Sequence, residues 1–515
     1  MSRQSFVTGA LILLSASFIN RVIGFIYQMV IIRLIKPEGV GLFNMVFPIY
    51  ILVMVLASMG IPVAIAKLVA EEVARNNIRG ANRIFKICLS ILIVSSIFFT
   101  TLLILCAPLL TKYLFPNPKV YYIFLCLVPG IIVVAICSAF RGYFQGLQQM
   151  TPTAITQTLE QIVRVVTGLF IAYLLLPRGV EFAAMGAALG VVIGEVAGCL
   201  TMIYLYFNRQ RPYSVGPNIY PEPVKTTLTR IFGLGIPVTL TRFFSTLILS
   251  VEAVLIPQRL QAAGMSVSDA TSAYGQFVGI AEALLFTPSM ITISLATALI
   301  PAISDALALN NYRLVQNRTS KALRITFCVG FPCIAVFLLL PKEMCGVLFG
   351  YADAGVILGA FAIGAPFLYF QQTTTGILQG MGQAMIPFKN MMVASIIKIL
   401  GLYYLITLPQ FGVLGAAYSM NIGYITMAFL NYLNLRKLIG YQINWSHDIV
   451  KPFLAALGMG LVIWQVKSFL SFSPLFTLLG ALPAGCISYL FFLFLLGGIH
   501  RDNIKFIKNI IDKRA

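Results

Sequence analysis

Charged side chains are scarce in this chain. Only 10% of its 515 residues are Asp, Glu, Lys or Arg, whereas roughly 25% is usual for soluble domains. Hydrophobic residues make up 59%, and the mean hydropathy is +0.92. This composition excludes an ordinary water-soluble domain and indicates an integral membrane protein.

Several chemical signatures are also missing. The nine cysteines form no CxxC pair and only two histidines accompany them, so we expect neither a zinc site, nor a disulfide framework, nor a cofactor. There is no Walker motif for ATP hydrolysis. A membrane-embedded glycosyltransferase or polymerase would need paired acidic groups on a sizeable outer loop, but the acidic residues of the predicted outer loops are scattered. We therefore expect a protein that is not an enzyme.

Long apolar runs follow one another along the whole chain. Each is long enough to cross a hydrocarbon core of about 30 Å as an α-helix, and none alternates as a membrane β-strand would. The sequence predicts an all-α membrane protein with about fourteen transmembrane helices. The predicted spans are 7–32, 41–69, 84–111, 121–147, 153–176, 183–207, 230–257, 272–302, 322–349, 355–381, 388–408, 412–435, 450–470 and 475–498.

Basic residues set the predicted orientation. The net charge is +20, and most of the 36 Lys and Arg residues fall on the face that holds both termini. Because basic loops stay on the cytoplasmic side, we predict a multi-pass protein of the bacterial cell membrane with both termini cytoplasmic. These basic residues are spread over several loops, so membrane topology and the contact of the loops with the phospholipid bilayer explain the net charge. We therefore expect no nucleic-acid partner.

The chain also repeats itself. The segment Arg141–Gln149 returns as Thr375–Gln383 at an offset of 234, and Met185–Ala188 returns as Leu414–Ala417. Since each half has an even number of spans, the repeats are predicted to be parallel. The predicted domains are a six-helix lobe at 1–210, a cytoplasmic linker at 211–229, a second six-helix lobe at 230–440, two further transmembrane helices at 441–500 and a basic cytoplasmic tail at 501–515.

Six cations lie inside the predicted spans. They are Arg21, Lys67, Arg141, Arg164, Arg242 and Lys398. A cation at the centre of a bilayer costs about 3 kcal/mol on insertion scales, so it normally faces water, a partner or an anionic substrate. Lys67 and Arg141 lie near span ends, where long side chains extend to the interface. The other four lie near the midplane in two pairs, Arg21 with Arg242 and Arg164 with Lys398, and are the predicted substrate-binding residues.

Glutamates inside the spans offer a competing, purely structural explanation for these cations. Glu160 stands four residues before Arg164, where the two side chains can pair. Glu195, Glu252 and Glu282 could neutralise other cations. With Glu160, they are also the candidate sites for a coupling proton or sodium ion. For Arg164 and Lys398, substrate binding and a purely structural pairing with a glutamate both stay open.

Arg21 and Arg242 have no acidic residue one helical turn away, which favours an anionic ligand for this pair. Arginine binds phosphate through two parallel hydrogen bonds, so a diphosphate is favoured over a carboxylate or a halide.

Four segments carry a resemblance to a known family. They are Asn20–Phe25, Glu38–Phe43, Gly60–Glu71 and Ala298–Ser304. As a set they resemble the polysaccharide-transport branch of the multidrug/oligosaccharidyl-lipid/polysaccharide exporter superfamily, which includes sporulation proteins and the lipid II flippases. The resemblance covers essentially all the predicted spans.

The resemblance implies two six-helix lobes in a V, alternating access to a cationic cavity, and a groove for a lipid tail formed by the last two spans. Its implied cargo is an undecaprenyl-diphosphate-linked saccharide, either lipid II or a related precursor, moved from the inner to the outer leaflet for spore cortex peptidoglycan. A cation-coupled drug exporter of the same superfamily, or a flippase for another polysaccharide precursor, are the alternatives.

The chain departs from the lipid II flippases at positions of functional arginines. Of two arginines in their first span, one matches Arg21, while the other falls on Tyr27. Their second-span arginine has no equivalent between Phe47 and Ala66, and their eighth-span arginine falls on Ala283. Arg242 and Lys398 are therefore expected to compensate.

Overall fold

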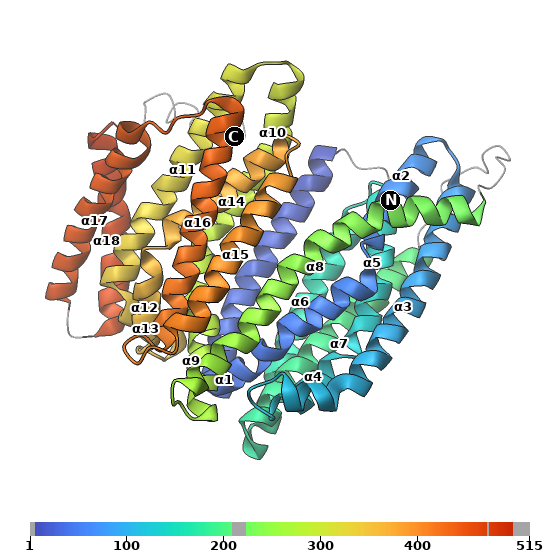
Figure 1. Cartoon of the computed structure of the whole chain (residues 1–515), viewed down its shortest axis with the longest axis horizontal. Coiled ribbons are helices and arrows are strands. Elements are labelled where there is room, and N and C mark those ends of the chain that lie inside the picture. Colours follow the sequence, from blue (N-terminus) through green and yellow to red (C-terminus); the bar gives the residue numbers. More distant parts are fainter. Residues whose placement is uncertain (1–5, 209–222, 471–472, 498–515) are drawn as a thin grey trace. The chain divides into compact units, whose positions relative to one another are not determined.

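The computed structural model describes residues 6–208, 223–470 and 473–497. Within these residues every regular element is a helix (Figure 1). Twelve described helices, or thirteen with one bent pair, are long and apolar enough to cross a membrane. The all-α membrane fold is confirmed, while the count of fourteen stays a prediction. The tail at 501–515 and most of the linker at 211–229 lie outside the described residues.

Contacts divide the chain into two compact units. Unit 1 comprises residues 1–261 and 265–275, and unit 2 comprises 262–264 and 276–515. The helices of unit 1 are α1 (Phe6–Ser58), α2 (Ile61–Ala74), α3 (Ile78–Tyr113), α4 (Val120–Leu127), α5 (Gly130–Gly146), α6 (Thr151–Leu175), η1 (Leu176–Arg178), α7 (Val180–Phe207), α8 (Val224–Ala262) and α9 (Val267–Gln276). By contacts α8 groups with unit 1, whereas the repeat assigns it to the second lobe; the lobe boundaries stay a prediction.

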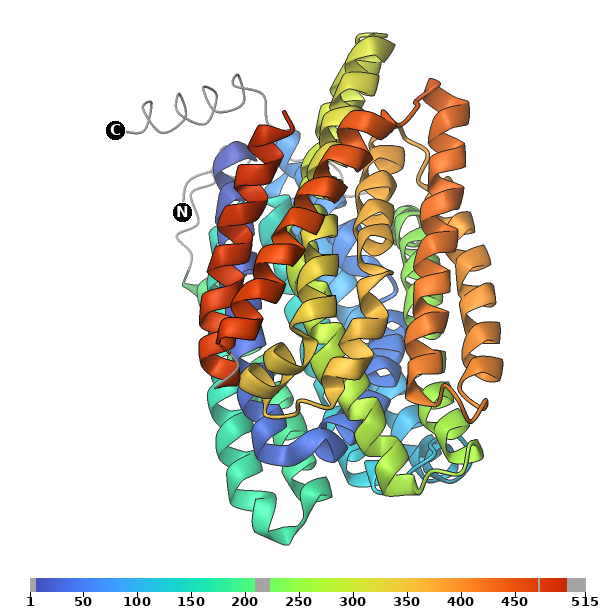
Figure 2. The same cartoon turned by 90° about the vertical axis from the view of Figure 1, so that its left-hand side faces the viewer.

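Unit 2 holds the remaining helices, and its last two, α17 and α18, run side by side (Figure 2). The elements are the π-helix η2 (Phe277–Glu282), α10 (Ala283–Ala308), α11 (Tyr312–Leu339), α12 (Pro341–Phe349), α13 (Ala354–Ala362), α14 (Ala365–Gly380), α15 (Met385–Leu405), α16 (Val413–Ile439), the π-helix η3 (Trp445–Val450), α17 (Lys451–Phe469) and α18 (Pro474–Leu495). Their buried faces form apolar clusters that include Ile303, Leu323 and Ile463.

Prolines accompany two breaks in the helices. The break predicted between the first two spans falls at Lys36, the one non-helical residue inside α1 (φ 61°, ψ 167°), because the residue before a proline, here Pro37, is pushed out of the α region. The predicted span 41–69 is itself divided between α1 and α2 at Met59 and Gly60, which have positive φ. The predicted span 322–349 is instead divided at Leu340, just before Pro341 begins α12.

The internal repeat is confirmed by matching helix contacts. A Cβ added at Gly142 would lie 2.5 Å from the Pro62 carbonyl oxygen, and one at Gly376 would lie 2.6 Å from that of Ala296. Both residues of the second pair are 234 positions after those of the first. The contact of α5 with α2 in unit 1 therefore recurs as that of α14 with α10 in unit 2, and glycine permits the close approach in both places.

Helix starts repeat at the same offset. Asn77 caps α3 by accepting a hydrogen bond from the Gly80 N–H, and Asn311 caps α11 by accepting one from the Leu314 N–H. The preceding residues Asn76 and Asn310, also 234 apart, both have positive φ, 56° and 52°. An asparagine cap satisfies a backbone donor that the helix leaves unpaired. The two halves thus share their local structure as well as their sequence.

Candidate functional site

Arg164 lies in a partly buried cluster of charges between α5, α6 and α7 of unit 1. Its Nη2 is 2.6 Å from Glu160 Oε1 and 3.2 Å from Glu195 Oε1, while Arg141 Nη2 is 2.6 Å from Glu160 Oε2. Exposed fractions are 22% for the Arg164 side chain, 19% for Arg141 and 12% for each glutamate. Two positive and two negative groups cancel, which lowers the cost of placing them at membrane depth.

Glycines on α7 bring this cluster together. A Cβ at Gly194 would lie 3.0 Å from Arg164 Cβ, and one at Gly198 would lie 3.2 Å from Glu160 Cβ. The absence of side chains there lets α7 approach α6, so that Glu195 reaches Arg164. The predicted pairing of Glu160 with Arg164 is confirmed. The expectation that Arg141 extends to the interface is wrong, because its guanidinium turns to Glu160 on a neighbouring helix.

Arg21 and Arg242 differ from Arg164. Arg21 lies midway between the start of α1 and its break at Lys36, and Arg242 lies at the middle of α8. Both are exposed, and within the described parts of the chain neither makes an ion pair. Unit 1 therefore has two unneutralised arginines at span depth, chemically suited to an anionic group.

The other predicted site residues are dispersed. Lys398 of α15 is half-buried, and a Cβ at Gly423 of α16 would lie 3.2 Å from its Cβ and Cδ. Glu252 of α8 is 5% exposed. Glu282 ends the six-residue π-helix η2, an irregularity often found at functional positions. Among the described residues, no three His, Cys, Asp or Glu side chains come together as a metal site.

The repeat relates Lys398 to Arg164 in space as well as in sequence. Each cation lies on the first helix of a hairpin and faces a glycine on the second, Gly194 opposite Arg164 and Gly423 opposite Lys398. A Cβ at Gly186 would likewise meet Ala172, and one at Gly415 would meet Ile406. The predicted equivalence of these two positions is confirmed for the hairpins α6–α7 and α15–α16.

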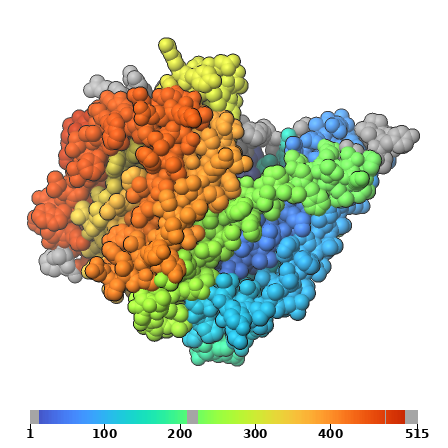
Figure 3. Space-filling model, in the orientation of Figure 1, coloured from blue at the N-terminus to red at the C-terminus, as the bar shows by residue number. Residues whose placement is uncertain are grey.

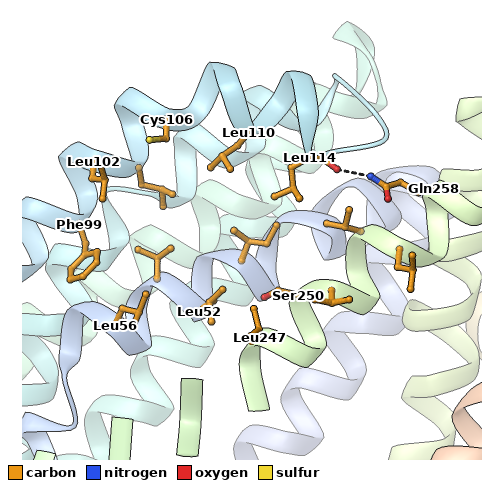
Figure 4. Close-up of a pocket in the computed structure, with 16 residues that line it drawn as sticks. Leu52, Leu56, Phe99, Leu102, Cys106, Leu110, Leu114, Leu247, Ser250 and Gln258 are labelled. Atoms are coloured by element: carbon orange, nitrogen blue, oxygen red, sulfur yellow. Dashed lines mark hydrogen bonds between the residues drawn. The ribbon is translucent and has the colours of Figure 1, made fainter. Parts of the chain in front are cut away.

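An apolar cavity of about 520 Å³ lies in unit 1 between α1, α3 and α8. Figure 4 shows side chains from the three helices converging on it, among them Leu52, Phe99 and Leu247. At one end Gln258 Nε2 donates a hydrogen bond to the Leu114 carbonyl oxygen, 2.9 Å away. Such a lining suits a hydrocarbon chain and disfavours a charged head group. No local sequence signal marks this cavity, because its three walls are far apart along the chain.

The wall formed by α8 follows the surface of unit 1. In the space-filling view the green band of α8 crosses the blue surface that α1 and α3 form (Figure 3). Close backbone contact anchors its first part, since a Cβ at Gly235 would lie 2.5 Å from the Met59 carbonyl oxygen. Arg230 of α8 pairs with Glu71 of α2, with 2.5 Å between Nη2 and Oε2. These contacts position the helix that carries Arg242.

The chain matches two known family models and several known proteins. The family model described as polysaccharide biosynthesis protein matches residues 6–307, more than half of the chain, and the MatE model matches residues 269–404. Stage V sporulation protein B of Bacillus subtilis is 32% identical, with 98% of each chain covered. Lipid II flippase MurJ of the same organism is 23% identical, with 90% of this chain and 89% of the relative covered.

Solved structures show the same fold. Lipid II flippase MurJ in an inward closed conformation has a TM-score of 0.71 at 15% identity, covering 96% of this chain and all of the other. An inward-facing multidrug resistance MATE family transporter of the MOP superfamily has a TM-score of 0.68 at 15% identity, covering 82% and 94%. The predicted resemblance to the polysaccharide-transport branch, and to its sporulation members, is confirmed.

Proposed function

This chain belongs to the polysaccharide biosynthesis protein family and is a multi-pass membrane flippase or exporter, and we propose that its cargo is an undecaprenyl-diphosphate-linked saccharide. Lipid II or a related cell-wall precursor is the proposed cargo, moved from the inner to the outer leaflet, with spore cortex peptidoglycan as the process served. Both termini are proposed to be cytoplasmic. The relatives include two sporulation proteins and a lipid II flippase, which supports this choice.

The observation that carries the proposal is the contrast among the arginines at span depth. Arg141 and Arg164 are neutralised by glutamates, whereas Arg21 and Arg242 are exposed and make no ion pair within the described residues. A diphosphate supplies the negative charge and the oxygen pairs that guanidinium groups bind. Arg21 and Arg242 are thus proposed as the primary contacts for the diphosphate.

Arg164 and Lys398 are proposed as a second, weaker pair of contacts. An anion that approaches Arg164 competes with Glu160 and Glu195, so its binding releases a carboxylate that can take up a proton or sodium ion. This exchange is the proposed route by which Glu160 and Glu195 couple an ion to transport. Glu252 and Glu282 stay candidates for the same role.

Transport requires no covalent chemistry. The head group must cross about 30 Å of hydrocarbon, and replacing its water with arginine contacts lowers the barrier. The polyprenyl chain stays in an apolar environment, to which the cavity lined by Leu52, Phe99 and Leu247 is suited. Release demands that the outward state bind the cargo less tightly, because only differential affinity shifts a conformational balance.

The test is transbilayer movement of labelled lipid II in liposomes, followed by its protection from an external modifying reagent. The wild-type protein is expected to accelerate movement above that of protein-free liposomes. Arg21→Ala and Arg242→Ala are each expected to lower the rate about tenfold or more, since a hydrogen bond to a charged group contributes roughly 1.5–3 kcal/mol.

Lys67→Ala is the matched control, because Lys67 is also an exposed cation within a candidate span but lies near its cytoplasmic end. It is expected to leave the rate close to that of the wild type. Equal movement with and without protein would reject the proposed cargo. Movement of a cationic drug in its place would favour the drug-exporter alternative.

A further inference from the structure

A cavity of about 270 Å³, with both apolar and polar lining residues, lies in unit 2 between α10, α14 and α16. Its polar lining is Thr297 of α10 together with Gln371, Gln372, Thr375 and Gln379 of α14. None of its lining residues is charged. The cavity therefore differs in chemistry both from the arginine cluster and from the apolar cavity of unit 1.

The carboxamides around this cavity have hydrogen-bonding capacity to spare. Gln371, Thr375 and Gln379 are spaced four residues apart and so share one face of α14. Within the described residues, the side-chain amides of Gln371 and Gln379 make no hydrogen bond. Gln372 uses only its Oε1, which accepts from Thr292 Oγ1 at 2.6 Å. Each free amide offers both donors and acceptors.

Buried hydrogen bonds hold the wall of the cavity in place. Asn431 of α16 is fully buried and donates to Thr374 Oγ1 at 3.0 Å and Thr375 Oγ1 at 3.3 Å. It also accepts from Asn390 Nδ2 at 2.8 Å. Together with the bond from Thr292 to Gln372, these contacts fix α14 from both sides. A site held by such supporting bonds loses little entropy when a ligand binds.

We propose that this cavity binds a neutral sugar ring of the cargo, an inference that rests on the proposed transport of a lipid-linked saccharide. Carboxamides and hydroxyls complement sugar hydroxyls, which both donate and accept. A hydrocarbon chain would leave the amides unsatisfied, and an anion would find no cation in the lining. The volume lies just below the roughly 300–1,000 Å³ of drug-sized pockets, so it suits one ring and not a whole oligosaccharide.

The test uses full-length protein in liposomes and two lipids that differ only by a sugar: undecaprenyl diphosphate, and undecaprenyl diphosphate that carries one N-acetylglucosamine. The double variant Gln371→Leu/Gln379→Leu keeps the bulk of both side chains but removes their hydrogen bonds. It is expected to lower movement of the sugar-bearing lipid roughly tenfold, the effect of two lost hydrogen bonds. Movement of the sugar-free lipid is expected to stay at the wild-type rate, which also shows that the variant is folded.

Two further variants sharpen this test. Gln145→Leu is the matched control, because Gln145 occupies the position 234 residues before Gln379 in unit 1, and it is expected to leave the ratio of the two rates unchanged. Thr297→Val removes one exposed hydroxyl from the opposite wall and is expected to lower the ratio a few-fold. It keeps the test decisive in case the double variant does not fold.

The possible outcomes separate this inference from the proposed function. A fall for the sugar-bearing lipid alone supports the sugar site. An equal fall for both lipids, or no fall in either, overturns the sugar site while leaving the proposed transport intact. A wild-type protein that moves neither lipid overturns the proposed function and the sugar site with it.

Discussion

The two units use the same helix packing to build two opposite kinds of polar site. In unit 1 the site is a cluster of two arginines and two glutamates on α5, α6 and α7. In unit 2 the helices equivalent to α5 and α7, α14 and α16, line a cavity together with α10, and the polar side chains there are neutral amides and hydroxyls. The related positions are Arg141 and Thr375, Glu160 and Ala394, Arg164 and Lys398, and Glu195 and Tyr424.

This comparison separates what fixes the backbone from what fixes the chemistry. Glycines at matching positions, such as Gly142 and Gly376, set how closely the helices approach in both units. The side chains that surround these contacts then decide whether the space is filled by ion pairs or left open. Thr375 is too short to fill the place that Arg141 occupies in unit 1, and the cavity of unit 2 lies beside it.

The largest expected effect on stability comes from breaking the charged cluster. Glu160→Gln removes the carboxylate that both Arg141 and Arg164 contact at 2.6 Å. Losing one partner of a buried ion pair costs about 3–5 kcal/mol, so the thermal unfolding midpoint in detergent should fall sharply. Glu195→Gln affects one arginine at 3.2 Å and should cost less. An equal midpoint for Glu160→Gln and the wild type would show that the cluster does not stabilise unit 1.

The next effect comes from imposing the charge of unit 1 on unit 2. Thr375→Arg places a guanidinium where no glutamate is available, since Ala394 stands at the position equivalent to Glu160. An unpaired cation inside a span costs up to about 2.5–3.5 kcal/mol, the value that insertion scales give for the helix centre. Adding Ala394→Glu supplies a carboxylate at the position equivalent to Glu160, so it should reverse part of the fall in the unfolding midpoint. A double variant no more stable than Thr375→Arg alone would contradict the equivalence of the two sites.

A smaller and symmetrical effect is expected at the repeated glycines. Gly142→Ala and Gly376→Ala each force a Cβ to within 2.6 Å or less of a backbone carbonyl oxygen, and overpacking of this kind costs about 1–3 kcal/mol. Because the contacts match, the two variants should lower the unfolding midpoint by similar amounts. A marked difference between the two unfolding midpoints would show that the two helix contacts match in sequence but not in packing.

The smallest effect is expected for an exposed ion pair. Lys119 Nζ lies 3.4 Å from Glu181 Oε2 and 3.7 Å from Glu38 Oε1, and the Lys119 side chain is 47% exposed. Glu181→Gln should therefore change stability by no more than about 1 kcal/mol, and less at high salt. A loss as large as that of Glu160→Gln would contradict the distinction drawn between buried and exposed pairs.

Local and periodic features were predictable from the sequence. Apolar runs predicted helices in the right places because a span must be long and uniformly apolar. The offset of 234 predicted matching helix contacts, and the four-residue spacing predicted the pairing of Glu160 with Arg164. Each of these depends on residues close in sequence or on a repeated pattern.

Features that depend on distant residues were missed. The pairing of Arg141 with Glu160 joins two helices, so span position alone suggested a different environment. The amide cavity needs α10, α14 and α16 together, although the stripe of Gln371, Thr375 and Gln379 on one helix face was a visible signal.

The central claim is that the unpaired arginines, Arg21 and Arg242, are the primary contacts of the diphosphate. The most direct measurement is the equilibrium affinity of the purified full-length protein for undecaprenyl diphosphate. The account predicts that Arg21→Ala/Arg242→Ala weakens binding about tenfold or more, while Arg141→Ala, even where it lowers stability, leaves the affinity of the folded protein within about twofold of the wild type. Unchanged affinity in the double variant, or a larger loss in Arg141→Ala, would contradict it.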